Sequence, residues 1–410
     1  MATTETDSIE LVYGRSRQAV TVRRADWQRW QPVRAPDAAP VDAYTLMREA
    51  LEHPLRFAPL RRALTPDDRV VVVVDEQLPH LPELLRGLLE HLHSAGVRMQ
   101  AVTLLVPASR SRQNWLEVLP EAFEEIQIEI HNPSDRDRIS YLASTRGGER
   151  IYLNRTLIDA DQLIVLAGRR FDPLTRYSGA ETAIYPTFSD EHAQARLTNS
   201  LSWFGVNKAA EDLHRDACEI ARLLGSVFLV QVIESEGDQL HAILAGLLDT
   251  SRDGIRLLRQ CRRANLPTLA KCVIATISGD PTRHTFADMA AALGCAARVV
   301  EPDGQIALLT EVAPHLPEAA QVLRTSDTPE AAIKRLKRRR SEGAAAVLKW
   351  AYAATRAHLY IHSQLSDGIV EELFATPIEH AKQVQRLLDA EGPIVIIPDA
   401  HKHQLHYRPE

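Results

Sequence analysis

The sequence has 410 residues, of which 45% are hydrophobic and 25% charged, a composition typical of a soluble globular protein of about two domains. The formal net charge of −6 and the low aromatic content of 5% argue against a nucleic-acid-binding surface, because such surfaces are basic and often stack bases on aromatic rings. Four scattered cysteines without a CxxC pair, a polar start and the lack of a long apolar window predict a cytoplasmic protein with no signal peptide and no membrane partner.

The first half of the chain predicts an α/β arrangement. Residues 9–23 alternate as a short hairpin does, and residues 69–74 form a continuous β-branched run typical of a strand covered on both faces. An amphipathic helix over 81–95 and a strand over 99–106 follow, so these two strands are expected to be parallel. Further strands are predicted over residues 126–131, 139–143, 150–154, 163–167, 227–233 and 239–245, with helical segments over 116–125, 191–224 and 250–264.

A second α/β pattern begins at residue 270. It predicts strands over 270–277, 298–300, 305–309, 358–362 and 393–397, and helices over 285–293, 315–324, 329–340, 343–355 and 378–390, with a turn at Pro302-Asp303-Gly304. We therefore predict an α/β protein of two domains, with mostly parallel sheets flanked by helices and a cleft between them. The predicted domains are residues 1–264 and 265–397, and the tail 398–410 is free to return to the first domain.

The stretch Leu163–Pro186 is the main candidate for a site. A buried strand ends at Gly168, and ligands of open α/β sheets bind just beyond the carboxyl ends of strands. Three arginines crowd the loop that follows: Arg169, Arg170 and Arg176. Guanidinium groups there favour a carboxylate or phosphate ligand. An equally good explanation is pairing with the nearby acidic residues Asp172, Glu181 and Asp190.

Four other segments carry weaker signals. The turn Asp75–His80 offers a carboxylate and an imidazole for acid–base work, but a cap at a helix start explains it better. Ala108–Arg112 suits an anion or a solvated loop equally well, whereas Lys334–Arg340 is better explained as a solvated face than as a phosphate or RNA patch. The terminal His401, His403 and His406 are a weak metal signal. No GxGxxG, Walker, HExxH or GxSxG motif is present, which excludes the ordinary nucleotide, zinc-protease and serine-hydrolase sites.

The order of several motifs points to a known family. Asp75 is followed by Pro79, the strand Thr103–Val106 comes next, and Tyr177–Pro186 reads YSGAETAIYP; the second half contains ISGDP, PDGQIALL and IVIIP. In this order the chain resembles the nickel-dependent lactate racemase family over nearly its whole length. The resemblance implies a cytosolic two-domain α/β protein whose cleft holds a nickel pincer built on a pyridinium mononucleotide. It also implies that a lysine attaches this cofactor, which takes a hydride from a 2-hydroxy acid while two histidines act as bases.

The residues to which the resemblance assigns this chemistry are altered. The family's Ser-Gly-Gly-x-Lys reads Ser178-Gly179-Ala180-Glu181-Thr182, so the cofactor lysine falls on Thr182. The two catalytic histidines fall on Ser111 and Asp172, and the nickel histidine falls near Thr198. A threonine cannot form the covalent link, and neither base remains at its motif.

Two hypotheses follow. The preferred one is a diverged family member without the nickel cofactor, which binds a small anion such as a hydroxy acid or acts as a structural partner. The other is an active 2-hydroxy-acid racemase or epimerase, which works through altered residues or a non-covalently held cofactor. Asp75 and Asp172 are the candidate catalytic residues, and no metal ligand is assigned. The candidate ligand-binding residues are Arg112, Arg169, Arg170, Arg176, Ser178, Gly179 and Thr182.

Overall fold

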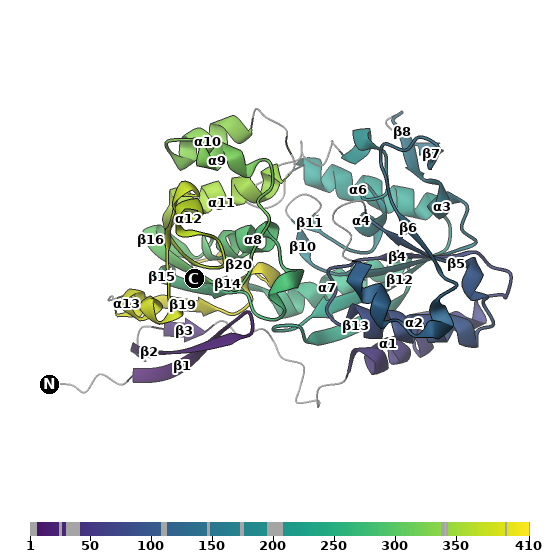
Figure 1. Cartoon of the computed structure of the whole chain (residues 1–410), viewed down its shortest axis with the longest axis horizontal. Coiled ribbons are helices and arrows are strands. Elements are labelled where there is room, and N and C mark those ends of the chain that lie inside the picture. The colour runs from purple at the N-terminus through teal and green to yellow at the C-terminus, as the bar shows by residue number, and fades with distance from the viewer. Residues whose placement is uncertain are drawn as a thin grey trace. The chain divides into compact units, whose positions relative to one another are not determined.

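The chain forms two compact units, which we name by their position in the sequence (Figure 1). The computed structural model describes residues 6–23, 27–29, 42–107, 113–145, 148–172, 176–194, 208–337, 341, 343–389 and 392–409. The N-terminal unit comprises Ala35–Ser235 and Gln239–Arg259. The C-terminal unit comprises Gln260–Glu410 together with Met1–Arg34 and Glu236–Asp238.

The N-terminal unit is built on a six-stranded sheet of order β13-β12-β9-β4-β5-β6. All its neighbouring strands are parallel except β13, which runs antiparallel to β12. The strands are β4 (Val70–Val74), β5 (Val102–Val106), β6 (Gln127–Ile130), β9 (Gln162–Gly168), β12 (Val227–Glu234) and β13 (Leu240–Leu247). The helices are α1 (Ala43–Glu52), α2 (Leu81–Ser94), α3 (Arg155–Ile158), α4 (Glu181–Ile184), α6 (Lys208–Leu223) and α7 (Ser251–Arg262). Two hairpins flank the sheet: β7 (Ile139–Ser144) with β8 (Arg150–Asn154), and β10 (Phe171–Asp172) with β11 (Arg176–Tyr177).

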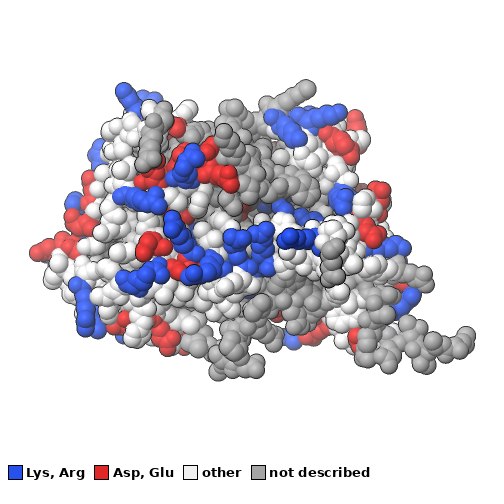
Figure 2. Space-filling view, turned by 180° about the vertical axis from the view of Figure 1, so that it is seen from behind, with Lys and Arg blue, Asp and Glu red and all other residues white. Residues whose placement is uncertain are grey.

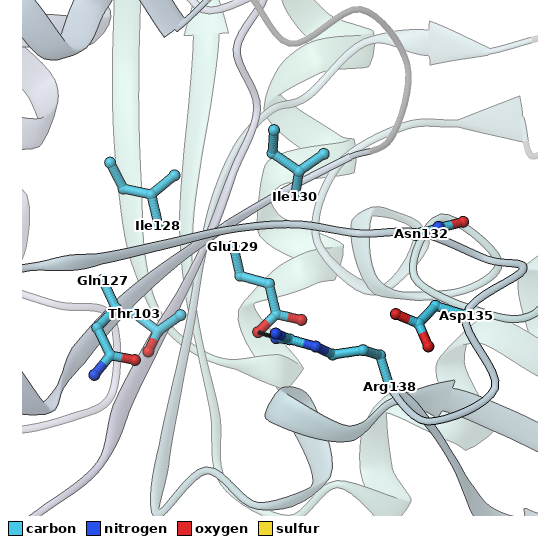
Figure 3. A pocket seen from close by; sticks show the side chains of 8 residues that line it. All are labelled: Thr103, Gln127, Ile128, Glu129, Ile130, Asn132, Asp135 and Arg138. Carbon is cyan, nitrogen blue, oxygen red and sulfur yellow. Dashed lines mark ion pairs between the residues drawn. The ribbon is translucent and has the colours of Figure 1, made fainter.

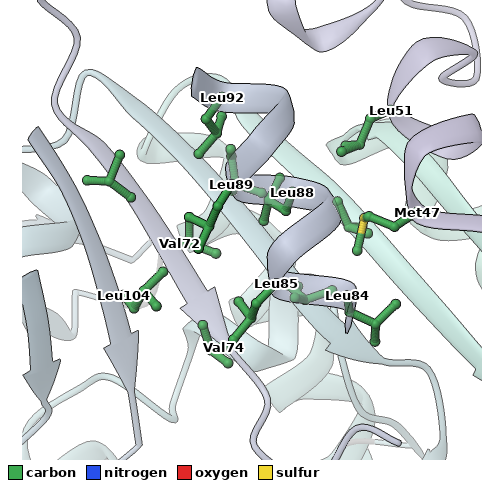
Figure 4. Close-up of a cluster of buried hydrophobic side chains, with 14 of the residues drawn as sticks. Met47, Leu51, Val72, Val74, Leu84, Leu85, Leu88, Leu89, Leu92 and Leu104 are labelled. Carbon is green, nitrogen blue, oxygen red and sulfur yellow. The ribbon is translucent and has the colours of Figure 1, made fainter. Parts of the chain in front are cut away.

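Both faces of this sheet are covered, as the β-branched run of β4 predicts. Val70, Val72 and Val74 pack in one buried cluster with leucines of α2 and with Met47 and Leu51 of α1 (Figure 4). Val71 and Val73 point to the other face and share a cluster with side chains of α4 and α6. Successive strand residues face opposite sides, so a strand that is apolar throughout requires helices on both sides.

The sheet order places a topological switch point at the centre of this unit. From β4 the chain passes to β5 on one side, whereas β9 pairs with the other side of β4. The loops after β4 and β9 therefore leave the carboxyl edge in different directions, which is where open α/β sheets bind ligands. Asp75 follows β4, and its backbone N–H donates to Leu166 O at 3.0 Å.

The C-terminal unit contains a second six-stranded sheet, whose described pairings are all parallel, of order β18-β17-β16-β15-β19-β3. Its strands are β15 (Ala270–Thr276), β16 (Val300–Leu309), β17 (Ala357–His362), β18 (Ala375–Pro377), β19 (Ile394–Ile397) and β3 (Trp27–Arg29). Its helices are α8 (Phe286–Ala296), α9 (Ala320–Arg324), α10 (Pro329–Leu336), α11 (Ala344–Arg356), α12 (Asp367–Glu372) and α13 (Gln385–Leu388). Thr285 and Asp288 form a capping box at the start of α8, and Phe286 stacks on the buried Trp350.

The predicted α/β class with mostly parallel sheets is confirmed, but the contacts divide the chain differently from the predicted boundary at residue 264. The hairpin of β1 (Thr6–Tyr13) and β2 (Ser16–Arg23) places its apolar face in a cluster with β15, β16 and β19. Strand β3 pairs with β19, so the first residues belong to the C-terminal unit. The tail also stays in that unit, because β20 (Gln404–Tyr407) pairs with β14 (Arg263–Leu266).

Some predicted elements have different lengths. The predicted turn Pro302-Asp303-Gly304 lies within the single strand β16, where Asp303 has φ +58° and the pairing with β15 shifts register. The helix expected over 315–324 is reduced to α9, and that over 378–390 becomes a 3-10 turn at Ala381–Val384 followed by α13. None of the helices in the described part of the chain has the length and apolarity that a bilayer crossing requires. The face drawn in Figure 2 carries side chains of both charge signs.

Candidate functional site

Asp75 anchors the turn at the switch point through three hydrogen bonds. Its Oδ2 accepts from the backbone N–H of Gly168 at 3.0 Å and from Arg170 Nη1 at 2.6 Å, and its Oδ1 accepts from the N–H of Gln77 at 3.0 Å. Arg170 also pairs with Glu234, at 3.0 Å from Nε and 2.9 Å from Nη2. Although burial lowers the pKa of the Arg170 guanidinium, the two carboxylates raise it overall. One positive charge thus lies between two negative ones, an arrangement that disfavours a further anion.

Arg169 is almost fully buried, with 1% of its surface exposed. All its N–H groups point at protein acceptors: Gln231 Oε1 (3.0 Å), the carbonyl oxygens of Ser178 and Gly179 (both 3.2 Å), and Ser251 O (3.1 Å) and Oγ (2.5 Å). Its Nη2 also lies 3.6 Å from Glu181 Oε2. A guanidinium has five N–H donors, so no donor of Arg169 is left for a ligand. These contacts favour a structural role for Arg169 over the predicted binding of an anion.

The buried partner of Arg169 is Glu181, at the start of α4. Its Oε2 accepts from Ser251 Oγ at 2.7 Å, while its Oε1 lies 3.5 Å from His214 Nε2. Burial raises the pKa of Glu181, but the Arg169 charge and the Ser251 hydrogen bond outweigh it and lower the pKa overall. The pair is therefore ionised inside the protein. The Arg169–Glu181 ion pair is one of those considered from the sequence, whereas Arg170 forms ion pairs with Asp75 and Glu234, which were not considered.

The turn Ser178–Thr182 packs directly on the end of β9. Gly179 has φ +81°, and a Cβ at this position would lie 2.6 Å from Gly168 O. Thr182 is buried, and its Oγ1 is 2.9 Å from each of the carbonyl oxygens of Tyr177 and Gly179, to which it donates. Among the described residues, Ser178 Oγ has no hydrogen-bond partner. Gly179 and Thr182 thus fix the backbone of the turn.

Replacing Gly179 with alanine should destabilise the N-terminal unit by about 2–4 kcal/mol, because backbone strain and a clash with Gly168 O act together. The matched control is Gly225→Ala. Gly225 has φ +88° but nothing within 4 Å of the added Cβ, so only the strain applies. Urea unfolding of both variants measures the difference, and equal losses would show that the turn tolerates the extra atom.

Some of the predicted site residues lie outside the part of the chain that the structure describes. Arg112 and Ser111 lie outside the described residues, as do residues 338–340 of the basic run and the side chain of Arg176. Asp172 is half-buried, and its backbone lies opposite that of Arg176 in the antiparallel β10–β11 hairpin. The Gln77 N–H donates to Asp75 Oδ1 in a local turn, whereas the N-cap of α2 is His80, which makes no side-chain capping bond. The structure therefore brings Asp75, Arg169, Arg170, Ser178, Gly179 and Thr182 together at one edge of the sheet.

Sequence reasoning missed a cluster beside this turn. The ligand atoms of Glu181, His214 and Cys218 all lie within 4.8 Å of one another. Burial, and then the nearby Glu181 carboxylate, raise the pKa of the Cys218 thiol to about 11. One signal was available in the sequence: His214 and Cys218 are four residues apart on a predicted helix, which places them on one face.

The described cavities lie elsewhere in the N-terminal unit. One, of about 530 Å³, is lined by β6 and by the loop that follows this strand. Two of its lining residues, Glu129 and Arg138, form an ion pair at 3.2 Å (Figure 3). A second cavity, of about 470 Å³, also contains Thr103, Gln127 and Arg138 in its wall. None of the candidate site residues that the structure describes lines either cavity.

Comparison with known proteins finds a matching family model and similar solved structures. Residues 13–197 match the family described as "Lactate racemase N-terminal domain". The N-terminal part of the chain is therefore similar to the lactate racemase N-terminal domain. A structure of the lactate racemase apoprotein from Thermoanaerobacterium thermosaccharolyticum has a TM-score of 0.77 and 16% identity, covering 97% of this chain and 100% of the other. A protein from Thermotoga maritima has a TM-score of 0.68 and 13% identity, covering 90% and 100%.

At these identities the two structures show that the chain shares their fold. No curated protein sequence matches it. The matched region spans β4, β5 and β9, so it includes the switch point and the turn with Thr182. The family assignment and the candidate site therefore concern the same part of the chain.

Proposed function

We propose that this lactate racemase-like protein binds a small anion such as a 2-hydroxy acid and does not use a covalently attached nickel pincer. The observation that carries the proposal is Thr182, which stands where the resemblance places the cofactor lysine. Its hydroxyl is buried and donates to the carbonyl oxygens of Tyr177 and Gly179. A hydroxyl offers no amine for the link, so the residues of this turn do not fit the covalently held cofactor.

The geometry narrows the choice of anion-binding residue. Arg169 is saturated by protein acceptors, and Arg170 lies between two carboxylates. We therefore assign ligand binding to Arg112 and Arg176. Arg112 directly follows Ser111, where the resemblance places a catalytic histidine, and Arg176 directly precedes the Tyr177–Thr182 turn. A guanidinium binds a carboxylate through two parallel N–H···O bonds.

Binding should depend on Arg112 and Arg176. Isothermal calorimetry with D- and L-lactate and longer 2-hydroxy acids should detect binding by the wild type and a loss of about 10- to 100-fold in Arg112→Ala or Arg176→Ala. This loss corresponds to one charged hydrogen-bonded contact of about 1.5–3 kcal/mol. Arg98→Ala is the control, because that side chain is 64% exposed and pairs with Asp67. Unchanged affinity in both variants would refute the assignment.

The same ligands separate binding from catalysis. We expect no interconversion of D- and L-lactate by protein co-expressed with the enzymes that build the nickel cofactor. Racemisation above the level of a mock purification would contradict the proposal. It would establish the alternative of an active racemase or epimerase, for which Asp172, at the position of a family base, is the first residue to replace.

A further inference from the structure

Three potential metal ligands of different chemistry meet between α4 and α6. His214 Nε2 lies 3.5 Å from Glu181 Oε1 and 3.8 Å from Cys218 Sγ, and the three ligand atoms all lie within 4.8 Å of one another. A tetrahedral zinc ion with ordinary bond lengths requires N···O and S···N separations of about 3.4 and 3.6 Å. Two of the three separations therefore lie close to those of a coordinated ion before any ligand moves.

Neighbouring residues hold the Glu181 carboxylate in place through one oxygen and leave its other oxygen available for a metal ion. Glu181 Oε2 is fixed by Ser251 Oγ at 2.7 Å, with Arg169 at 3.6 Å. Glu181 Oε1 is buried, and among the described residues it accepts no hydrogen bond of ordinary geometry. A carboxylate ligand oriented by a second shell of this kind is typical of metal sites.

Charge and access also suit a divalent cation. The carboxylate and the thiolate supply two anionic ligands and the imidazole a neutral one, while Arg169, 3.6 Å from Glu181 Oε2, offsets part of the carboxylate charge. The side chain of Glu181 is 1% exposed and that of His214 is 22% exposed, so an ion can enter from the His214 side. Because one donor is sulfur and one is nitrogen, the set selects zinc-class ions over magnesium or calcium, which take oxygen ligands.

We propose that Glu181, His214 and Cys218 form a three-ligand site for a zinc-class divalent cation. When the metal–sulfur bond forms, the Cys218 thiol releases its proton to water. Three protein ligands leave a fourth coordination position for water, as in open zinc sites. The site uses residues of α4 and α6 and does not involve the position of the family's cofactor lysine.

Cobalt substitution tests the proposal on the full-length, reduced and chelator-treated protein. We expect one equivalent of Co²⁺ to produce a sulfur-to-cobalt charge-transfer band, and zinc to displace it, whereas Mg²⁺ has no effect. Cys218→Ser should abolish the band, and Cys261→Ser, which changes a thiol on α7 outside the cluster, should preserve it. The absence of a band, or a band that survives Cys218→Ser, would overturn the site.

A second variant keeps the test independent of folding. His214 is partly exposed, so His214→Gln should retain the wild-type circular dichroism. It should weaken zinc binding by at least about 10- to 100-fold, because loss of a residue that merely orients a metal ligand already lowers metal affinity by that factor. Unchanged zinc affinity in folded His214→Gln would refute the proposal. The ion should leave when the protein is denatured with chelator, which distinguishes it from a covalently attached nickel cofactor.

Discussion

Replacing Arg169 with methionine should destabilise the N-terminal unit by about 3–5 kcal/mol, because it leaves the buried Glu181 carboxylate without its counter-charge. Gln231 and the carbonyl oxygens of Ser178, Gly179 and Ser251 lose their donors as well. Each unsatisfied buried group adds to the loss. This single side chain joins β9, β12, the Ser178–Thr182 turn and α7.

Urea unfolding combined with hydrogen exchange of the β9 and β12 amides would measure this loss in the unit concerned. Arg69→Met is the matched control: the pair of Arg69 with Asp161 is exposed and should contribute at most about 1 kcal/mol. The double variant Arg169→Met/Glu181→Leu should recover part of the loss, since the uncompensated charge is gone. A loss below about 1 kcal/mol for Arg169→Met would show that the guanidinium is not a structural group.

Replacing Asp399 with asparagine should destabilise the C-terminal unit by about 3 kcal/mol at neutral pH. Asp399 follows β19 at the switch point of the second sheet and is fully buried. It accepts from the N–H of Ser278 at 2.7 Å, from Ser278 Oγ at 2.8 Å and from the N–H of Gly237 at 2.5 Å. An asparagine has the same shape, but its amide group turns a donor toward these donors.

The effect should depend on pH in a defined direction. Burial raises the pKa of Asp399, but the charges of Lys402 and His401 and the backbone hydrogen bonds outweigh it, so the pKa falls below its ordinary value. A carboxyl group whose folded pKa is depressed contributes its full stabilisation above its unfolded pKa of about 3.9 and loses it as the pH falls. The stability difference between wild type and Asp399→Asn should therefore shrink below about pH 4.

Urea midpoints at pH 7, 5, 4 and 3, read from hydrogen exchange of the β15 and β19 amides, would check this dependence. Asp327→Asn serves as the control, because that side chain is exposed. A difference between wild type and Asp399→Asn that stays constant or grows on acidification would contradict the role assigned to the Asp399 carboxylate.

The strand-end location of the site could be predicted from the sequence because it depends on local patterns. The β-branched run of β4 marks a strand covered on both faces, and Gly168 marks the end of β9. Both predictions concern neighbours along the chain. The alternation of residues 9–23 likewise predicted the β1–β2 hairpin.

Glu181, which is close to Arg169 in the sequence, was among the predicted partners. The other partners of the two arginines could not be predicted, because they are distant in the sequence. Glu234 and Ser251 lie 64 and 82 residues beyond the arginines that they bind. Composition alone cannot distinguish a loop of ligand-binding arginines from a buried ion-pair network. The same limit applies to the N-terminal hairpin, whose apolar face packs against strands more than 200 residues later.

The intact mass of the denatured protein, after co-expression with the enzymes that build the nickel cofactor, tests the central claim most directly. Because Thr182 offers no amine and its hydroxyl is bound to two carbonyl oxygens, we expect the mass of the unmodified chain. A stoichiometric added mass that corresponds to the pincer cofactor would contradict the account, since another residue would then carry the covalent link.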